Sequence, residues 1–229
     1  MKKLFLLTLL LPAALICFSQ RNANVGIFAG TAYYMGDINP NRHFYRPRPS
    51  LGLLYRYNLN KHYSLRANAY YAYLSGSDID FADEYHADRQ TSPVDFNTSV
   101  LDGAIQFEFN FLPYVPNNKK WEYTTYVSGG FGYSMILSSG VGTSHDAVRN
   151  PIPHFTFPFG VGFKLNITRK ISAGAEWSFR KAFSDRVDFL PNPSNQTSLS
   201  HNNDWYSFAG IFITYKFFNF AVDCPAYAQ

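Results

Sequence analysis

The charged residues of this chain that could do chemistry lie on one face of a repeated alternating pattern. Five basic and four acidic side chains share that face: Arg56, Arg66, Asp102, Glu108, Glu122, Lys164, Glu176, Arg180 and Lys216. Acids and bases that face one another can relay protons or select ions. They can also form ion pairs that fill a closed interior, because an eight-stranded barrel is just wide enough for its inward side chains to fill it. We favour the second possibility and call the nine groups the lumen charge network. They would support the structure and carry no reaction.

The other candidate sites have weaker patterns. The six histidines are dispersed among connecting segments without the spacing of metal ligands. Four acidic residues of one connecting segment could bind calcium weakly: Asp78, Asp80, Asp83 and Glu84. That segment lacks the glycine and the terminal carboxylate of a dedicated calcium loop, so we favour a solvated acidic loop. No Ser-His-Asp or Cys-His arrangement has a supporting context, and we predict no catalytic residue, cofactor or metal. An enzymatic outer-membrane barrel of the lipase or protease type is the alternative.

The glycines at positions 129, 130, 132, 160 and 162 superficially resemble a phosphate-binding loop. Neither a lysine nor a helical pattern follows them, so that interpretation has no support. A glycine within a strand more often makes room for a large neighbour. Lumenal tyrosines such as Tyr70 and Tyr126 are candidates for those neighbours.

Alternation of apolar and polar residues, which is typical of half-buried strands, defines the elements that position the nine charges. In residues 50–59, one face holds Leu51, Leu53, Tyr55, Tyr57 and Leu59, and the other holds Ser50, Gly52, Arg56 and Asn58. Six further segments repeat the pattern: residues 63–73, 101–111, 121–135, 155–167, 171–179 and 205–217. Residues 24–36 add an eighth strand, whose facing the pattern does not determine. The sequence therefore predicts an all-β fold of eight antiparallel strands.

The distribution of charge indicates which face of the strands meets the surroundings. Along the seven later strands, the apolar face carries no charged residue before Lys181, at a strand end. A basic side chain facing lipid near mid-depth costs about 2–4 kcal/mol. Five would cost on the order of 10 kcal/mol, which is comparable with the whole stability of a domain. The rival is a soluble lipocalin-like barrel with its apolar face inward, but its outer surface would need more charges than these strands supply.

Connector lengths alternate between long and short, as in outer-membrane barrels with extracellular loops and periplasmic turns. The short connectors lie near residues 60–61, 112–120 and 168–170, and the long ones include residues 75–95 and 184–204. We therefore predict an eight-stranded antiparallel outer-membrane β-barrel at residues 20–218 in a Gram-negative bacterium. An even number of strands leaves both chain ends on the turn side, so residues 219–229 form a short periplasmic C-terminal tail.

The first residues, MKKLFLLTLLLPAALICFSQ, have the basic start and apolar run of a secretory signal peptide. We predict cleavage after Ser19, which removes residues 1–19 and with them Cys17. A lipoprotein is the alternative, but Ile16 is bulkier than lipoprotein processing prefers. The net charge of +4 is scattered rather than clustered, so it gives no indication of binding to nucleic acid.

The predicted tail carries the cysteine that remains, Cys224. A single thiol in an exported protein stays free or pairs with another chain. Apolar residues are unusual in a purely disordered terminus, and this tail contains Phe220, Pro225 and Tyr227. We hypothesise that these four residues bind a periplasmic partner. A free thiol and an intermolecular disulfide both stay open.

Four segments together resemble the PorG family of the type IX protein secretion system. They are GTAYYMGDINP, GAEWSFRKAFSDRVD, NNDWYSFAGIFITYKF and the late CP pair, in an order that spans nearly the whole mature chain. The resemblance implies a non-enzymatic outer-membrane barrel that anchors a periplasmic ring built from proteins resembling PorK, a lipoprotein, and PorN. It implies that the conducting pore is a separate, larger barrel. Phe217, with apolar residues at alternate positions before it, resembles the signal that the barrel-assembly machinery recognises.

Two other functions fit the same fold. A small adhesion or binding barrel would act through its extracellular loops. A transport or binding barrel would need unpaired polar groups in the lumen. The sequence alone leaves both open beside the scaffold.

Overall fold

The structure, a computed structural model, describes eight strands and parts of their connections. The described residues are 22–36, 39, 42–77, 80, 95–115, 122–141, 151–183 and 204–216. The strands are β1 (Asn22–Met35), β2 (Arg48–Asn58), β3 (Tyr63–Ser77), β4 (Asp95–Asn110), β5 (Tyr123–Val141), β6 (Ile152–Asn166), β7 (Ile171–Ala182) and β8 (Trp205–Lys216). Within these ranges there is no helix long and apolar enough to cross a membrane. The predicted signal peptide and tail lie outside the described residues and stay predictions.

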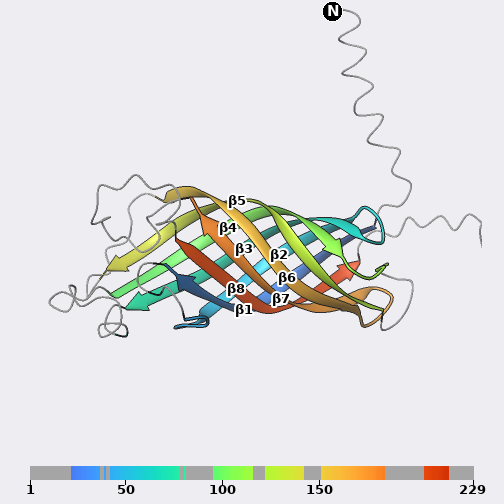
Figure 1. The fold of residues 1–229 in the computed structure, drawn as a ribbon, viewed down its shortest axis with the longest axis horizontal. Coiled ribbons are helices and arrows are strands. Elements are labelled where there is room, and N and C mark those ends of the chain that lie inside the picture. The colour runs from blue at the N-terminus through green and yellow to red at the C-terminus, as the bar shows by residue number, and fades with distance from the viewer. Residues whose placement is uncertain are drawn as a thin grey trace, which may run out of the picture.

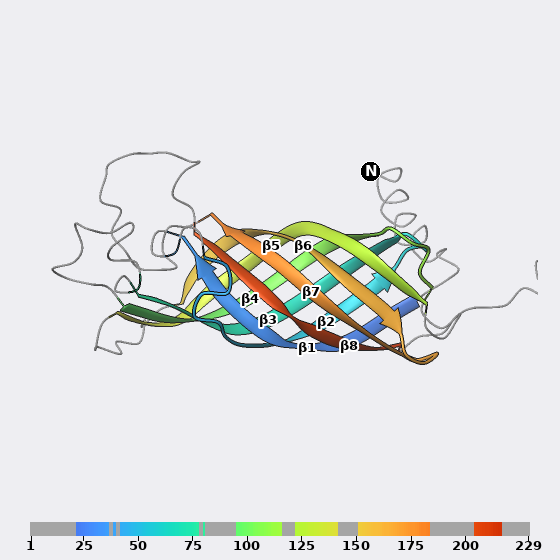
Figure 2. The same ribbon diagram turned by 60° about the horizontal axis from the view of Figure 1, so that its bottom comes forward.

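Each strand pairs with its neighbour in sequence, and β1 pairs with β8 to close a barrel. All eight pairings are antiparallel, as the alternating pattern predicts. Figures 1 and 2 show the strands crossing obliquely around one long axis. The short connections β2–β3 and β6–β7 lie at the end where β1 starts and β8 finishes, which we call the turn side. The opposite end is the loop side.

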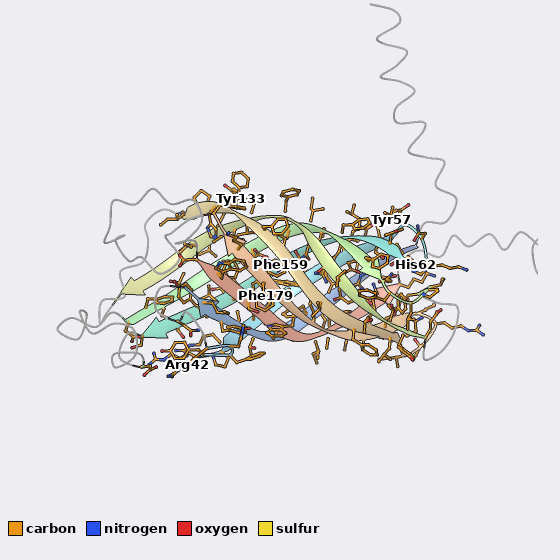
Figure 3. The ribbon with its side chains drawn as sticks, viewed as in Figure 1. Arg42, Tyr57, His62, Tyr133, Phe159 and Phe179 are labelled. Carbon is orange, nitrogen blue, oxygen red and sulfur yellow. The ribbon has the colours of Figure 1, made fainter. Side chains whose placement is uncertain are left out.

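The apolar face of the predicted pattern points outward. Leu51 and Leu53 are each 65% exposed and Phe131 is 78% exposed, whereas the alternate residues Arg56 and Glu108 are buried. Figure 3 shows side chains projecting from the outer wall along the whole barrel. The orientation expected for a membrane barrel is therefore the one that the structure has.

The structure also determines the facing of β1, which the sequence leaves open. Val25 and Ile27 are exposed outside, and Phe28 is buried inside the barrel. Phe28 stacks on Tyr70 of β3, with ring centroids 4.6 Å apart. This residue was hard to assign because an aromatic side chain suits both the lipid-facing wall and the lumen of this protein.

Two glycines make room for the lumenal tyrosines. A Cβ at Gly162 would lie 2.5 Å from the Tyr126 ring, as the sequence predicts for that glycine. Tyr70 instead fits against Gly52 of β2, where a Cβ would lie 2.1 Å from its ring. Both contacts are shorter than any side chain tolerates, so each glycine lets a large ring enter the narrow interior.

Candidate functional site

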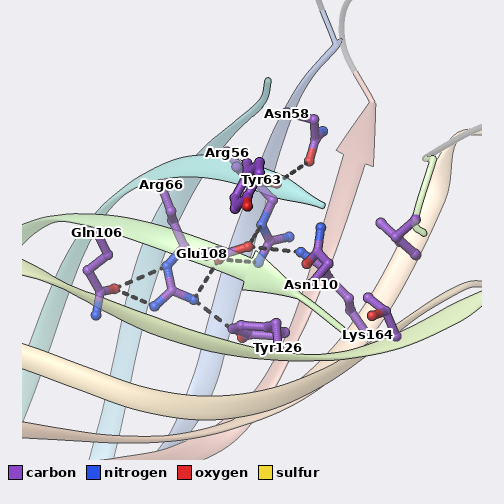
Figure 4. Close-up of polar contacts among 12 residues, drawn as sticks. Arg56, Asn58, Tyr63, Arg66, Gln106, Glu108, Asn110, Tyr126 and Lys164 are labelled. Carbon is purple, nitrogen blue, oxygen red and sulfur yellow. Dashed lines mark hydrogen bonds and ion pairs between the residues drawn. The ribbon is translucent and has the colours of Figure 1, made fainter. Parts of the chain in front are cut away.

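The turn-side half of the lumen is organised around Glu108 of β4 (Figure 4). This carboxylate accepts hydrogen bonds from Arg56 Nε at 2.8 Å and Nη2 at 3.0 Å, and from Lys164 Nζ at 2.8 Å. Arg66 Nη1 lies 3.3 Å from Glu108 Oε1. All four side chains are essentially inaccessible to solvent. One acid thus neutralises cations from three different strands.

Arg66 extends the cluster across the barrel to Glu176 of β7. Its guanidinium forms an ion pair with Glu176, whose Oε1 lies 3.1 Å from Nη2, and it donates to Gln106 Oε1. Tyr126 donates to the second Glu176 oxygen at 2.7 Å. Because β3 and β7 are four strands apart in an eight-stranded barrel, this ion pair closes the interior from opposite walls.

The strand register explains why the ion pairs reach beyond direct partners in the sheet. Arg56 and Arg66 are direct partners across β2 and β3, and like charges in that position destabilise a sheet. The other direct partners of these arginines in the sheet, Asn24 and Gln106, are uncharged. Carboxylates from β4 and β7 therefore supply the neutralising charge, as buried cations require.

A second cluster fills the loop-side half around Asp102 of β4. Arg180 Nε donates to this carboxylate at 3.0 Å, Ser134 Oγ at 2.6 Å and the Tyr206 hydroxyl at 3.0 Å. The Arg180 guanidinium also lies 5.1 Å from the centroid of the Phe208 ring. Of the aromatic side chains in this half of the lumen, Tyr70 was predicted from sequence, whereas Tyr206 and Phe208 were not.

Seven of the nine predicted lumen charges thus lie buried in two hydrogen-bonded clusters, and the other two lie at the turn-side rim. Glu122 immediately precedes β5 and Lys216 ends β8, and both are half-buried. The predicted partner-binding residues Phe220, Cys224, Pro225 and Tyr227, together with Phe217, lie outside the described residues.

Tyr114 closes the turn side, a role that the sequence pattern does not reveal. This residue follows β4 in the short connector and is 1% exposed. Its hydroxyl donates to Asn166 Oδ1 at 2.5 Å, and its backbone N–H donates to the Lys61 carbonyl at 2.9 Å. Burial raises the pKa of Tyr114 to about 12, so the hydroxyl keeps its proton and remains a donor. The ring also covers Lys164, whose Nζ lies 5.2 Å from its centroid.

Several polar atoms in the loop-side lumen have no hydrogen-bond partner among the residues that the structure describes. They include both ring nitrogens of His154, Thr156 Oγ1 and Ser178 Oγ, together with Nη2 of Arg180. These atoms come from β6 and β7, whose register places them on one inner wall. The loop-side lumen therefore has unused hydrogen-bonding capacity, whereas its charged groups are ion-paired.

Of the four acidic residues that we assign to a solvated loop, only Asp80 is within the described residues. Asp80 accepts hydrogen bonds from the Tyr45 hydroxyl at 2.6 Å and from Arg46 Nε at 2.9 Å. These donors hold the pKa of Asp80 below its usual value, and burial beside the carboxylate raises the pKa of Tyr45. In the part of the chain that the structure describes, no group of three or more His, Cys, Asp or Glu could hold a metal ion.

The β1–β2 connection has an unusual backbone. Phe44 and Arg46 have φ angles of 59° and 43°, a left-handed conformation that costs a residue with a side chain of order 1–3 kcal/mol. Tyr45 and Arg46 attach the connection to Asp80, and Arg46 Nη1 also reaches Asp95 at 3.3 Å. Phe44 and His43 pack instead against the outer wall of the barrel. Two independent sets of contacts offset the backbone cost.

A protein-family model described as "Domain of unknown function (DUF6089)" matches residues 2–226. This chain belongs to the DUF6089 family. No curated protein matches it.

Solved structures of other small barrels resemble this DUF6089 member. Neisserial surface protein A is 11% identical, with 85% of this chain and 97% of that chain covered and a TM-score of 0.51. The N-terminal β-barrel domain of Pseudomonas aeruginosa OprF is 14% identical, with coverage of 86% and 99% and a TM-score of 0.47. The outer membrane protein OprG from the same species is 9% identical, with coverage of 86% and 98% and a TM-score of 0.46. The likeness to Neisserial surface protein A, together with the closed strand pairing, confirms the eight-stranded outer-membrane barrel fold.

Proposed function

We propose that this DUF6089 protein is a non-enzymatic barrel that anchors a periplasmic assembly in the outer membrane of a Gram-negative bacterium. The observation that carries the proposal is the filled interior, in which Glu108, Glu176 and Asp102 neutralise fully buried cations. A lumen filled in this way cannot pass a protein cargo. The barrel then acts through its outer wall and its two ends.

The outer wall supports the membrane placement. Large apolar side chains are exposed on all eight strands, including Ile27, Leu53, Phe131 and Ile211. Monomeric soluble proteins rarely expose apolar patches larger than a few hundred Å². A wall of this kind is suited to lipid, and the predicted signal peptide would direct the chain out of the cytoplasm.

The turn side supports a periplasmic contact. Lys61, Arg169 and Lys170 are exposed in its two short turns, and the acidic residue described there, Glu122, is half-buried. A basic rim favours an acidic partner surface. With the PorG resemblance, we assign the partner to the ring proteins that resemble PorK and PorN. The tail residues Phe220, Cys224, Pro225 and Tyr227 would extend the same contact.

A crosslinking pull-down of the intact barrel from envelopes tests the anchor. Two variants are compared with the parent: deletion of the residues after Phe218, and Lys61→Glu with Arg169→Glu and Lys170→Glu. Both should insert, as shown by heat-modifiable mobility in gels, but lose the crosslinked ring proteins and protein secretion. Normal crosslinking and secretion in both variants would refute the anchor. Replacing Cys224 with Ser, followed by non-reducing gels, shows separately whether a disulfide contributes.

A small binding or adhesion barrel is the second candidate. The unused polar atoms of His154, Thr156 and Ser178 in the loop-side lumen favour it, because a binding site needs groups that are free to receive a ligand. This candidate predicts that the turn-side variants keep surface binding to cells or ligands. Loss of that binding on removal of the extracellular loops alone would support it over the anchor.

A further inference from the structure

Six aromatic rings form a continuous strip on the outside of the barrel at its loop side. The rings belong to Tyr33, Phe44, Phe159, Trp177, Phe179 and Trp205. From Trp205 the chain of contacts runs to Phe159 at 5.8 Å and on to Phe179 at 5.5 Å. It continues from Phe179 to Trp177 at 5.0 Å, to Phe44 at 5.9 Å and finally to Tyr33 at 4.9 Å, all between ring centroids. We call this set the outer aromatic strip.

The β1–β2 connection completes the strip from outside the barrel. Tyr33 faces outward, opposite Ser207 of β8, and is nevertheless fully buried because Phe44 and His43 cover it. Phe44 itself is 49% exposed, so its ring replaces that of Tyr33 as the outermost surface. Figure 3 shows Arg42, in the second half of this connection, beside the outer wall at the loop side.

The polar atoms of Trp177 and Tyr33, in the middle and at one end of the strip, bind other groups of the protein. Trp177 Nε1 donates to the Tyr33 hydroxyl at 2.9 Å and to Ser207 Oγ at 3.1 Å. Aromatic residues at a membrane interface commonly direct such groups to the headgroups or to water. Here they are satisfied internally, so the middle of the strip presents carbon atoms alone, as acyl chains require.

Cations lie at both ends of the strip. Lys181 Nζ lies 5.4 Å from the centroid of the Trp205 ring, on the outward face of β7. At the other end, His43 contacts the Tyr33 hydroxyl through Nδ1 at 3.4 Å, and the neighbouring Arg42 is exposed. A cation on a lipid-facing wall is tolerated close to the interface, where an anionic headgroup can neutralise it.

We propose that the outer aromatic strip binds a phosphate-bearing lipid of the outer leaflet. The acyl chains lie along the five rings other than the covered Tyr33, and the phosphates lie between Lys181 at one end and Arg42 with His43 at the other. A lipid fits this surface better than a second membrane protein because the middle of the strip offers neither donors nor acceptors. The β1–β2 connection adopts its left-handed backbone at Phe44 because the ring must reach this surface. The proposal does not depend on the periplasmic anchor.

Native mass spectrometry of the full mature chain in nanodiscs tests the proposal. The probe is bisphosphorylated lipid A, present at equal molar amounts with phosphatidylethanolamine. The wild type should retain lipid A preferentially on release. The variant Arg42→Gln with His43→Gln and Lys181→Gln should retain on the order of 30- to 100-fold less, the change expected for two to three basic groups at an anionic surface. The matched control, Lys61→Gln with Arg169→Gln and Lys170→Gln, removes three basic groups at the other rim and should behave as wild type.

Equal retention by the strip variant and the wild type would overturn the proposal, as would equal loss in the control variant. The first result is also the one expected if the strip instead docks a second membrane protein, since the nanodiscs contain none. Inorganic phosphate added in excess should not displace lipid A, because the rings hold the acyl chains; displacement would show that a free anion suffices and would contradict the lipid. Phe44→Ser keeps every charge and should still reduce retention.

Discussion

Glu108 shows how a single residue sets the electrostatics of the lumen. Its carboxylate forms ion pairs with Arg56, Arg66 and Lys164. Among the buried groups described on the turn side, Glu176 is the only other carboxylate. That cluster therefore has three cations and two acids. The acids are the limiting component, so the loss of an acid and the loss of a cation have different consequences.

This asymmetry gives a prediction for two substitutions. Glu108→Gln leaves three buried cations without their shared acid and should lower the free energy of unfolding by about 3–5 kcal/mol. Lys164→Met removes the excess cation at similar volume and should change it by no more than about 1.5 kcal/mol. Urea unfolding in lipid vesicles measures both. Equal losses in the two variants would show that Glu108 is not shared as described.

At the scale of the element, the β1–β2 connection links Asp80 on the loop side to the outer wall. We call this connection the latch. Tyr45 and Arg46 bind Asp80 on one side, and Phe44 packs on Trp177 on the other. The polar side depends on an ionised carboxylate. Asp80 has its pKa held below the usual value in the folded protein, so its contacts stabilise the latch above the ordinary aspartate pKa of about 4. They are lost as the pH falls through the lowered value.

The latch should therefore loosen in acid. A spin label at Pro47, which is exposed beside the latch, should become more mobile as the pH is lowered below about 4. Asp80→Asn should give the mobile spectrum already at neutral pH. A label at Thr168 in the opposite turn is the control and should not respond. A label at Pro47 that keeps the same mobility across this range would contradict a role for Asp80.

At the scale of the whole molecule, the barrel separates apolar side chains from ionic side chains in the radial direction. Its outer wall exposes apolar residues over the full length of the strands, and its interior buries ion pairs in two clusters. The barrel thus has its ionic groups inside and its apolar groups outside, the reverse of a soluble protein. Only a surrounding hydrocarbon phase makes this arrangement stable.

The radial arrangement predicts how spin labels respond to their surroundings. Labels at Phe107 and Phe163, on the outer wall of β4 and β6, should relax in collisions with oxygen, which concentrates in the bilayer. They should be protected from a water-soluble nickel chelate. A label at Thr168 should show the opposite behaviour. Collision of the nickel chelate with Phe107 or Phe163 would contradict the membrane orientation.

The sequence predicted most of the fold because its strongest signal is local. Residues such as Leu51 and Arg56 reveal their faces through a period of two, which follows from strand geometry alone. The nine charges could be assigned to one face for the same reason. Phe28 was not assignable, since its ring fits either side, and Tyr114 lies in a connector where no periodicity applies.

By itself, the sequence determined which residues of the seven later strands face lipid and which face the interior, because alternation and segregation of charge are properties of each strand alone. Only the tertiary structure decided that Arg66 pairs with Glu176, 110 positions away in the chain. It also decided that Phe44 folds back over Tyr33 on the outer wall. The first contact joins strands that are not neighbours in the sheet and depends on closure of the barrel and its width. The second depends on the path of a connection. The periodicity of a single strand determines none of these properties.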